Sequence, residues 1–242
     1  MDRVLKAFGR SIASQLHPKM LGLLVLPFVV SLLFWILAAW LVWTPLTEWL
    51  AAALFEGGWL GGVYGWAQGI GLGGIRDWIP ALIALLLVVP ASWVTAIAIV
   101  AVFAMPVVMR FLASRHYPGV ARLGTGSPLP GLWNLLIAIP LFAVGYLLSL
   151  PLWLIPPLAL VIPWFWWSWL TARVMRLDSL VEYADPQERQ AIEQRFRREY
   201  LLLAMIVSAL NLIPPLFLVT PVLSALAFGH YSLARLAERR QR

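Results

Sequence analysis

The chain has 242 residues, of which 62% are hydrophobic and only 12% are charged. A soluble globular protein carries about 25% charged residues, so this composition argues against a soluble enzyme, a nucleic-acid-binding protein and a disordered chain. The chain also has fourteen tryptophans, which gather at membrane interfaces, and no cysteine, which excludes a disulfide scaffold. The composition therefore predicts an all-α integral membrane protein in contact with the lipid bilayer, with 1–242 as a single membrane domain.

Residues 1–19 are expected to form an amphipathic helix. Apolar side chains recur at helical spacing and basic side chains fall on the opposite face: Leu5, Phe8, Ile12 and Leu16 against Arg3, Lys6 and Arg10. A short basic amphipathic helix beside a membrane span is typical of an interfacial position. The alternative is a disordered, positively charged tail.

Two full membrane spans are predicted at 20–44 and 78–109, because residues 20–47 and 78–109 contain no charged residue. A glycine-rich extracytoplasmic loop at 45–77 is expected to join them. Basic residues dominate four other parts of the chain and assign these to the cytoplasm: the N-terminus, the loop at 110–130, the segment 173–199 and the C-terminus. Both termini are therefore expected to be cytoplasmic.

Two further apolar stretches, 131–172 and 201–234, start and end on the cytoplasmic side and are therefore predicted to be hairpins. They share a motif: residues 154–163 are LIPPLALVIP, and residues 212–221 are LIPPLFLVTP. We interpret this as a parallel internal repeat in which each Pro-Pro pair forms the turn of its hairpin.

The predicted legs of the second hairpin, 201–211 and 222–234, would be roughly 16–20 Å long, too short for a hydrocarbon core about 30 Å thick. The favoured interpretation is two re-entrant, half-penetrating hairpins with Pro-Pro turns. The alternative gives 131–172 two full spans with a turn near Pro151. Irregular backbone at that depth must be covered by protein, which predicts a homo-oligomer. Between the hairpins, Asp185-Pro186 is expected to open a cytoplasmic helix in the segment 173–200.

Enzymatic chemistry finds little support in this sequence. Gly69, Gly71 and Gly74 fit a G-x-G-x-x-G pattern, but they lie in the loop before a membrane span and not after a strand. The three histidines have no partners at metal-ligand spacing, and no carboxylate lies inside an apolar stretch. We therefore expect no enzyme activity, no metal, no cofactor and no nucleic-acid partner.

Anion handling is the chemistry that the hairpins favour. A helix that starts deep in the membrane after a Pro-Pro turn presents free N–H groups and the positive end of its dipole, which together can bind an anion. Asn211 and Thr220 flank the second turn and can add hydrogen bonds; alternatively, Asn211 only caps the broken backbone. The candidate path residues in the two turns are Pro156, Pro157, Asn211, Pro214, Pro215 and Thr220.

The chain resembles the CysZ family of bacterial inner-membrane sulfate-uptake proteins, within the etoposide-induced-protein superfamily. The resemblance rests on Pro18-Lys19-Met20 with Pro27 after the amphipathic start, on Ala104-Met105-Pro106, and on NLIPPLFLVTPVLSALAF at 211–228. It implies two long helices, two half-penetrating hairpins and a multi-pass position in the bacterial inner membrane.

The resemblance also implies a small oxyanion, sulfate first, as the substrate. Two family motifs differ in this chain. The sulfate-associated Gly-hydrophobic-Arg falls on 19–21, where Lys19 is the only basic residue, and Pro-Phe-Asn reads Pro106-Val107-Val108. The resulting hypothesis is a channel-like permease with Lys19 at its cytoplasmic mouth. The 211–221 turn and its repeat partner, 153–163, would lie along the path. The alternative is a non-transporting membrane scaffold or envelope-biogenesis factor that binds a partner through helix 185–200.

Overall fold

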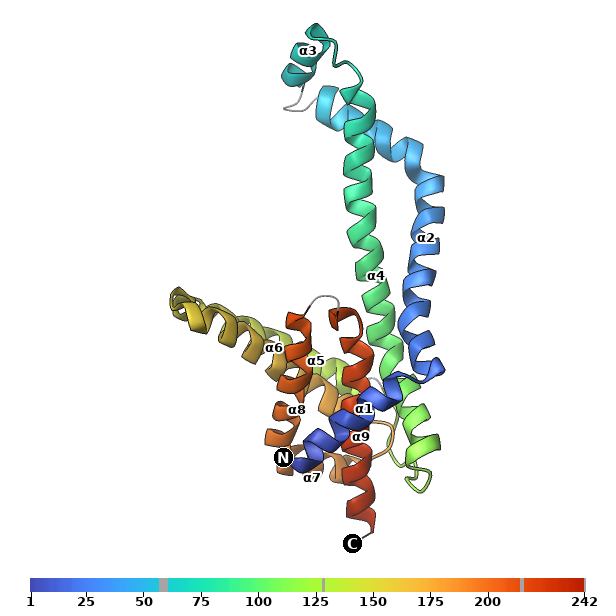
Figure 1. Ribbon diagram of the computed structural model, residues 1–242, viewed down its shortest axis with the longest axis vertical. Coiled ribbons are helices and arrows are strands. Elements are labelled where there is room, and N and C mark those ends of the chain that lie inside the picture. The colour runs from blue at the N-terminus through green and yellow to red at the C-terminus, as the bar shows by residue number, and fades with distance from the viewer. Residues whose placement is uncertain (57–60, 128, 214–215, 242) are drawn as a thin grey trace. The chain divides into compact units, whose positions relative to one another are not determined.

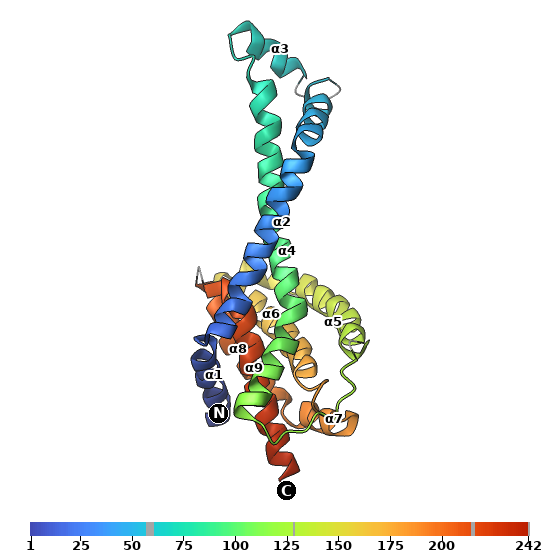
Figure 2. The ribbon, with the colours of Figure 1, turned by 90° about the vertical axis from the view of Figure 1, so that its right-hand side faces the viewer.

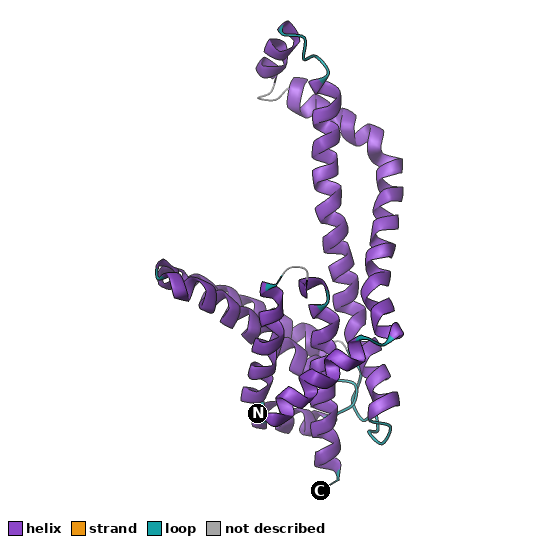
Figure 3. Cartoon of the chain, viewed as in Figure 1, coloured by secondary structure: helices purple, strands orange, loops and turns teal. Residues whose placement is uncertain are grey.

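The protein is described by a computed structural model over residues 1–56, 61–127, 129–213 and 216–241 (Figure 1). All regular secondary structure in these ranges is helical (Figure 3), which confirms the predicted all-α class. The chain divides into two compact units, residues 25–99 and residues 1–24 with 100–242. The composition predicts a single membrane domain over 1–242, which stays a prediction.

The first long helix extends beyond its predicted end. After α1 (Asp2–Gln15), α2 runs over Pro18–Ala51 and is followed by a π-helical segment at Ala52–Glu56. At 1.5 Å per residue, the 34 residues of α2 span about 51 Å, well past the predicted boundary at residue 44. The expected loop at 45–77 is therefore largely helical.

The rest of that region contains a short helix, α3 (Gly61–Gly69), and then the second long helix, α4 (Ile75–His116). α4 begins before and ends after the predicted 78–109. Three segments of the described chain are long and apolar enough to cross a membrane: Pro18–Glu56, Trp78–Ala96 and Leu129–Leu148. The first two correspond to the predicted spans, and the third is the outgoing leg of the first predicted hairpin.

The turn of the first hairpin is not formed by its Pro-Pro pair. The hairpin consists of α5 (Leu129–Leu148), a 3₁₀ turn at Leu150–Leu154 and α6 (Pro156–Asp178), so the turn contains Pro151 and ends before Pro156. Its legs of 20 and 23 residues are about 30 and 35 Å long. The turn position thus corrects our favoured interpretation and agrees with the alternative. How deeply the hairpin enters the membrane stays a prediction.

The second hairpin has one short leg. It consists of α8 (Arg197–Ala209), 3₁₀ turns at Leu210–Leu212 and Leu216–Leu218, and α9 (Thr220–Arg240). With 13 residues, α8 is about 20 Å long, as the sequence led us to expect for a leg that cannot cross the membrane. Pro214 and Pro215 lie outside the described residues.

The repeated motif adopts two different local structures. In the first copy, Pro156 is the first residue of α6, and the residues that follow are helical. In the second copy, the corresponding residues lie in the 3₁₀ turn Leu216–Leu218, and α9 starts only at Thr220. Proline is compatible with the first turn of a helix, so the motif permits an early or a late helix start.

The segment between the hairpins is broken into two helices. Asp185 caps α7 (Pro186–Arg195), and its side chain accepts hydrogen bonds from the amides of Gln187 and Glu188, both at 2.8 Å. The Glu188 side chain in turn accepts from the Asp185 amide, which completes a capping box. The chain then breaks at Phe196 before α8, so the expected helix over 185–200 is not continuous.

In the unit formed by residues 1–24 and 100–242, α9 is the central helix. It contacts α1, α6, α7 and α8, and Figure 2 shows it surrounded by α1, α6 and α8. Fifteen of its residues are buried. The largest fully buried side chains include Tyr200, Phe228 and Tyr231, and the hydroxyls of Tyr200 and Ser179 bond Ser232 Oγ at 2.8 and 2.6 Å. Burial of α9 therefore holds the unit together.

The α1 helix packs on α9 through a face that the sequence did not single out. Val4 and Ala7 are buried in the core, and Ser14 Oγ lies 2.9 Å from His230 Nε2. Leu5 and Leu16, which belong to the predicted apolar face, remain 52% and 71% exposed. Phe8 of the predicted apolar face packs against the core, whereas Ile12, like Leu5 and Leu16, stays exposed. The helix is thus amphipathic as expected, but only part of its predicted apolar face packs within the chain.

Candidate functional site

Asn211 lies at a cavity between the two hairpins. The cavity has a volume of about 330 Å³ and joins the first part of α6 to the end of α8 and the turn after it. Trp164 Nε1 donates a hydrogen bond of 3.2 Å to the Met205 carbonyl and so fixes the two hairpins to each other. The lining residues are Ala159, Leu160, Pro163, Trp164, Trp167, Ser208, Asn211 and Leu212.

This cavity brings together parts of both predicted turn regions. Asn211 belongs to the 211–221 element and Ala159, Leu160 and Pro163 to the 153–163 element, the two turns that the permease hypothesis places along one path. None of the described residues that line it is charged. The Asn211 amide has no hydrogen-bond partner among the described residues and is exposed, so it is free to bind a ligand.

Helix N-termini contribute less to this cavity than expected. Pro156 and Pro157 occupy the first two positions of α6 and have no N–H to offer. The next two amides, of Leu158 and Ala159, donate to the Ile155 carbonyl at 2.9 and 3.2 Å. The described start of α6 therefore has no free backbone donor for an anion. The hypothesis that a helix N-terminus binds the anion is thus limited to α9.

Thr220 and Lys19 lie away from this cavity. Thr220 is the first residue of α9, is 6% exposed, and its hydroxyl donates to the Leu216 carbonyl at 2.9 Å. Lys19 is exposed in the first turn of α2, and its amide donates to His17 Nδ1 at 3.2 Å. Of the predicted path residues, the structure thus brings Asn211 to the first hairpin but does not bring Lys19 or Thr220 there.

A second cavity, of about 490 Å³, lies where the end of α6 meets the start of α5 and the end of α4. Its charged lining residues are Arg110, Asp178 and Glu182. Burial, followed by the nearby Glu193 carboxylate, raises the pKa of Asp178 from 3.8 to about 6. Sequence reasoning missed this carboxyl group, because it lies just outside the apolar stretch.

The raised pKa predicts a pH-dependent effect of Asp178→Asn. The folded protein binds the proton more tightly than the unfolded chain, so Asp178 lowers stability as the pH rises from about 4 to about 6. The free energy of unfolding of the asparagine variant should equal that of the parent near pH 4 and exceed it by about 2 kcal/mol above pH 6. This difference is smaller than the full pKa shift implies, because the Asp178 side chain is partly exposed. Unfolding curves in detergent at both pH values test this; equal stability above pH 6 contradicts it.

The site that sequence reasoning missed most clearly is an ionic cluster between α8 and α9. Arg235 is buried, with 8% of its side chain exposed, and its Nη2 lies 2.5 Å from Glu199 Oε2. Burial alone would raise the pKa of Glu199, but hydrogen bonds donated by Tyr231 and Arg235 outweigh it and lower the pKa. Glu199 and Arg235 are far apart in sequence. The one signal in the sequence was an arginine directly after the apolar stretch 201–234.

These features define a class of protein: a helical membrane protein with three candidate membrane spans and a second hairpin that has one short leg. The family model described as Sulfate transporter CysZ/Etoposide-induced protein 2.4 matches residues 7–221. The match covers most of the chain, and the protein therefore belongs to this family. The resemblance seen in its proline-containing motifs is thereby confirmed.

Comparisons of the chain with curated proteins and with solved structures gave no match. Within the described ranges, no group of three His, Cys, Asp or Glu side chains is arranged to hold a metal ion. The family thus supports a membrane transporter-like role, and the residues that would perform it have to be argued from this structure.

Proposed function

We propose that this protein is a bacterial inner-membrane permease or channel-like protein for a small oxyanion, with sulfate as the first candidate, and that it is not an enzyme. The observation that supports this most is the family match over residues 7–221, because the family description names a sulfate transporter. The substrate and the direction of transport are part of the proposal, as is the cytoplasmic location of both termini.

The cavity at Asn211 supports a path between the hairpins. An amide side chain can donate hydrogen bonds to an oxyanion without holding it as tightly as a full positive charge would, and a transport path needs such weak binding. The uncharged lining suits rapid passage, because it contains no cation to trap the ion and no carboxylate to repel it. We place Lys19 at the entrance as the positive charge that attracts the anion.

The α5 helix supports an oligomer as part of the proposal. In its candidate span, only 6% of the residues are buried within the chain, so nearly the whole helix faces lipid or another subunit. A path beside a hairpin needs protein on every side. A homo-oligomer that packs around the two hairpins would provide this cover.

The proposal predicts sulfate entry into liposomes that contain the purified protein. Asn211→Ala should lower the rate by about tenfold, the effect of one lost hydrogen bond to an ionised group. Lys19→Gln should lower the rate mainly at low ionic strength, because a charge at the entrance acts over a screened distance. The measurement is the initial uptake of labelled sulfate, compared with empty liposomes.

Lys6→Gln is the matched control, since it removes the only other lysine from the chain at a position outside the proposed path. It should lower the uptake rate much less than Lys19→Gln does. Folded protein that admits neither sulfate nor other small oxyanions contradicts the proposal and favours the scaffold hypothesis. In that hypothesis, α7 and the start of α8 bind a partner.

A further inference from the structure

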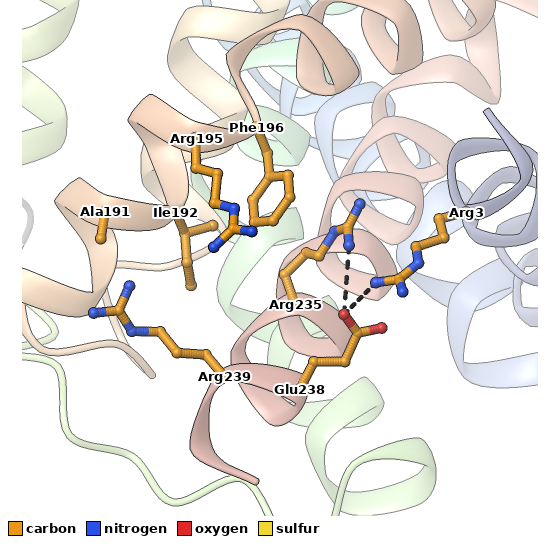
Figure 4. A pocket seen from close by; sticks show the side chains of 8 residues that line it. All are labelled: Arg3, Ala191, Ile192, Arg195, Phe196, Arg235, Glu238 and Arg239. Atoms are coloured by element: carbon orange, nitrogen blue, oxygen red, sulfur yellow. Dashed lines mark hydrogen bonds and ion pairs between the residues drawn. The ribbon is translucent and has the colours of Figure 1, made fainter. Parts of the chain in front are cut away.

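Four arginines from three separate parts of the chain converge on one pocket. The pocket, which we call the arginine pocket, lies between α1, the α7–α8 junction and the end of α9, and has a volume of about 230 Å³ (Figure 4). Its lining residues are Arg3, Ala191, Ile192, Arg195, Phe196, Arg235, Glu238 and Arg239. We infer that the arginine pocket binds a tetrahedral oxyanion with two negative charges, of the sulfate or phosphate-monoester type.

Arg235 is held rigidly at one wall of the pocket. Its Nε donates to the Tyr231 hydroxyl at 3.0 Å, and its Nη2 donates to Glu199 Oε2 at 2.5 Å. Its guanidinium also stacks on the Phe196 ring, 4.0 Å from the ring centroid. A cation fixed in this way loses little conformational entropy when an anion binds beside it.

Arg195 and Arg239 supply charge that no ion pair within the described residues neutralises; Arg195 lies over the Phe196 ring, 5.6 Å from its centroid. Neither forms an ion pair with a carboxylate in the part of the chain that the structure describes. In Figure 4 they approach from one side of the pocket, while Arg3, Glu238 and Arg235 lie linked on the other. The space between the two groups is therefore flanked by guanidinium groups on both sides.

The balance of positive and negative side chains at the arginine pocket favours a ligand with two negative charges. Four guanidinium groups face a single lining carboxylate, Glu238, which interacts with both Arg3 and Arg235. Arg235 has one further carboxylate partner, Glu199, behind the pocket wall. Two guanidinium groups, those of Arg195 and Arg239, thus remain without an ion pair among the residues that the structure describes. Planar guanidinium groups match the oxygens of sulfate and phosphate in pairs, which makes this ligand class the best fit.

A neighbouring cavity of about 210 Å³ extends the same positive region along α1. It shares Arg3, Arg235 and Glu238 with the arginine pocket and adds Lys6 and Arg10. The basic residues of α1, which the sequence placed on the polar face of an interfacial helix, therefore also contribute to a concave surface. The oxyanion can be a free ion or the headgroup of an anionic lipid, because α1 also has the exposed apolar side chains of an interfacial helix.

The inference goes beyond the proposed permease function. None of the proposed path residues lines the arginine pocket, and binding there does not require transport. A binding measurement therefore tests the pocket, whereas liposome uptake tests the permease, and either can fail without the other.

The test uses the full-length protein in nanodiscs of zwitterionic phosphatidylcholine. One arm measures binding of labelled inorganic sulfate and phosphate, and the other measures binding of phosphatidic acid by native mass spectrometry. The pocket variant is Arg195→Gln/Arg239→Gln, in which neither residue has an ion pair whose loss would disturb folding. The matched control is Arg197→Gln/Arg198→Gln, which removes the same charge from adjacent arginines that do not line the pocket.

We expect the pocket variant to weaken binding by at least about tenfold, because two charge-assisted contacts are lost, and the control to change it by less than about twofold. An effect on sulfate or phosphate assigns the pocket to a free ion, and an effect on phosphatidic acid alone assigns it to a lipid headgroup. Equal affinity of the pocket variant and the control for all three ligands, in protein with unchanged thermal unfolding, overturns the inference.

Discussion

Replacing Glu199 with alanine should lower the free energy of unfolding by about 3 kcal/mol. The variant leaves Arg235 with 8% of its side chain exposed and with only Glu238, at 3.4 Å, as a charged partner. A buried guanidinium without its carboxylate pays a desolvation cost that the remaining contacts do not offset. The Tyr231 hydroxyl also loses its acceptor. Chemical or thermal unfolding in detergent measures the loss.

A second Arg–Glu pair provides the control for this prediction. Arg76 Nη2 lies 2.6 Å from Glu56 Oε1, but 44% and 62% of these side chains are exposed. Glu56→Ala should therefore cost no more than about 1 kcal/mol. Adding Arg235→Met to Glu199→Ala should restore part of the lost stability, since a buried pair is often replaceable by apolar groups. If Glu199→Ala and Glu56→Ala lower the free energy of unfolding equally, the burial of Arg235 does not explain the loss of stability.

Gly124→Ala is expected to destabilise the protein by about 2–4 kcal/mol. A β-carbon at this position would lie 2.2 Å from the Val181 carbonyl oxygen. The obstacle is backbone, so no rotamer change relieves the clash. The loop must move instead, which breaks the hydrogen bonds from the Leu123 amide to the Tyr183 carbonyl and from the Gly126 amide to the Val181 carbonyl, at 3.2 and 3.3 Å.

Gly119→Ala is the matched control, because a β-carbon there meets no atom within 4 Å. We expect it to change the free energy of unfolding by less than about 1 kcal/mol in either direction. The Gly124 variant should also lose the contact between Arg240 Nη1 and the Ala121 carbonyl, which is 2.7 Å long. Faster proteolysis of the 118–127 loop in the Gly124 variant would report this loss. Normal stability of that variant would contradict the contact that the structure shows.

Local patterns in the sequence predicted the helices well. The charge-free stretches indicated the apolar part of α2 and α4, and Asp185 with Pro186 and Glu188 indicated the start and the capping box of α7. These predictions succeed because desolvation and capping act between residues that are close in the chain. The family was recognisable for the same reason, since its proline motifs are local.

The predictions that failed depended on packing. The Pro-Pro motif occurs twice, yet the first hairpin turns before it and Leu216–Leu218 forms a 3₁₀ turn where the first copy is helical. Proline restricts the backbone but accepts more than one helix start, so the motif alone does not determine where each helix begins. The same distinction holds at the candidate site. The sequence predicted Asn211 as a site residue but did not predict its position beside α6.

Composition and charge spacing were sufficient to establish an all-helical membrane protein and its long apolar helices, whereas local proline motifs indicated its family. Composition and charge spacing act through the transfer of side chains from water, which each segment undergoes largely independently of the others. The meeting of Arg3, Arg195 and Arg235 at one pocket, and the pairing of Arg235 with Glu199, required the folded chain. Electrostatic contacts depend on distance in space and not along the sequence, so the burial of α9 brings these charges together and gives the protein its polar sites.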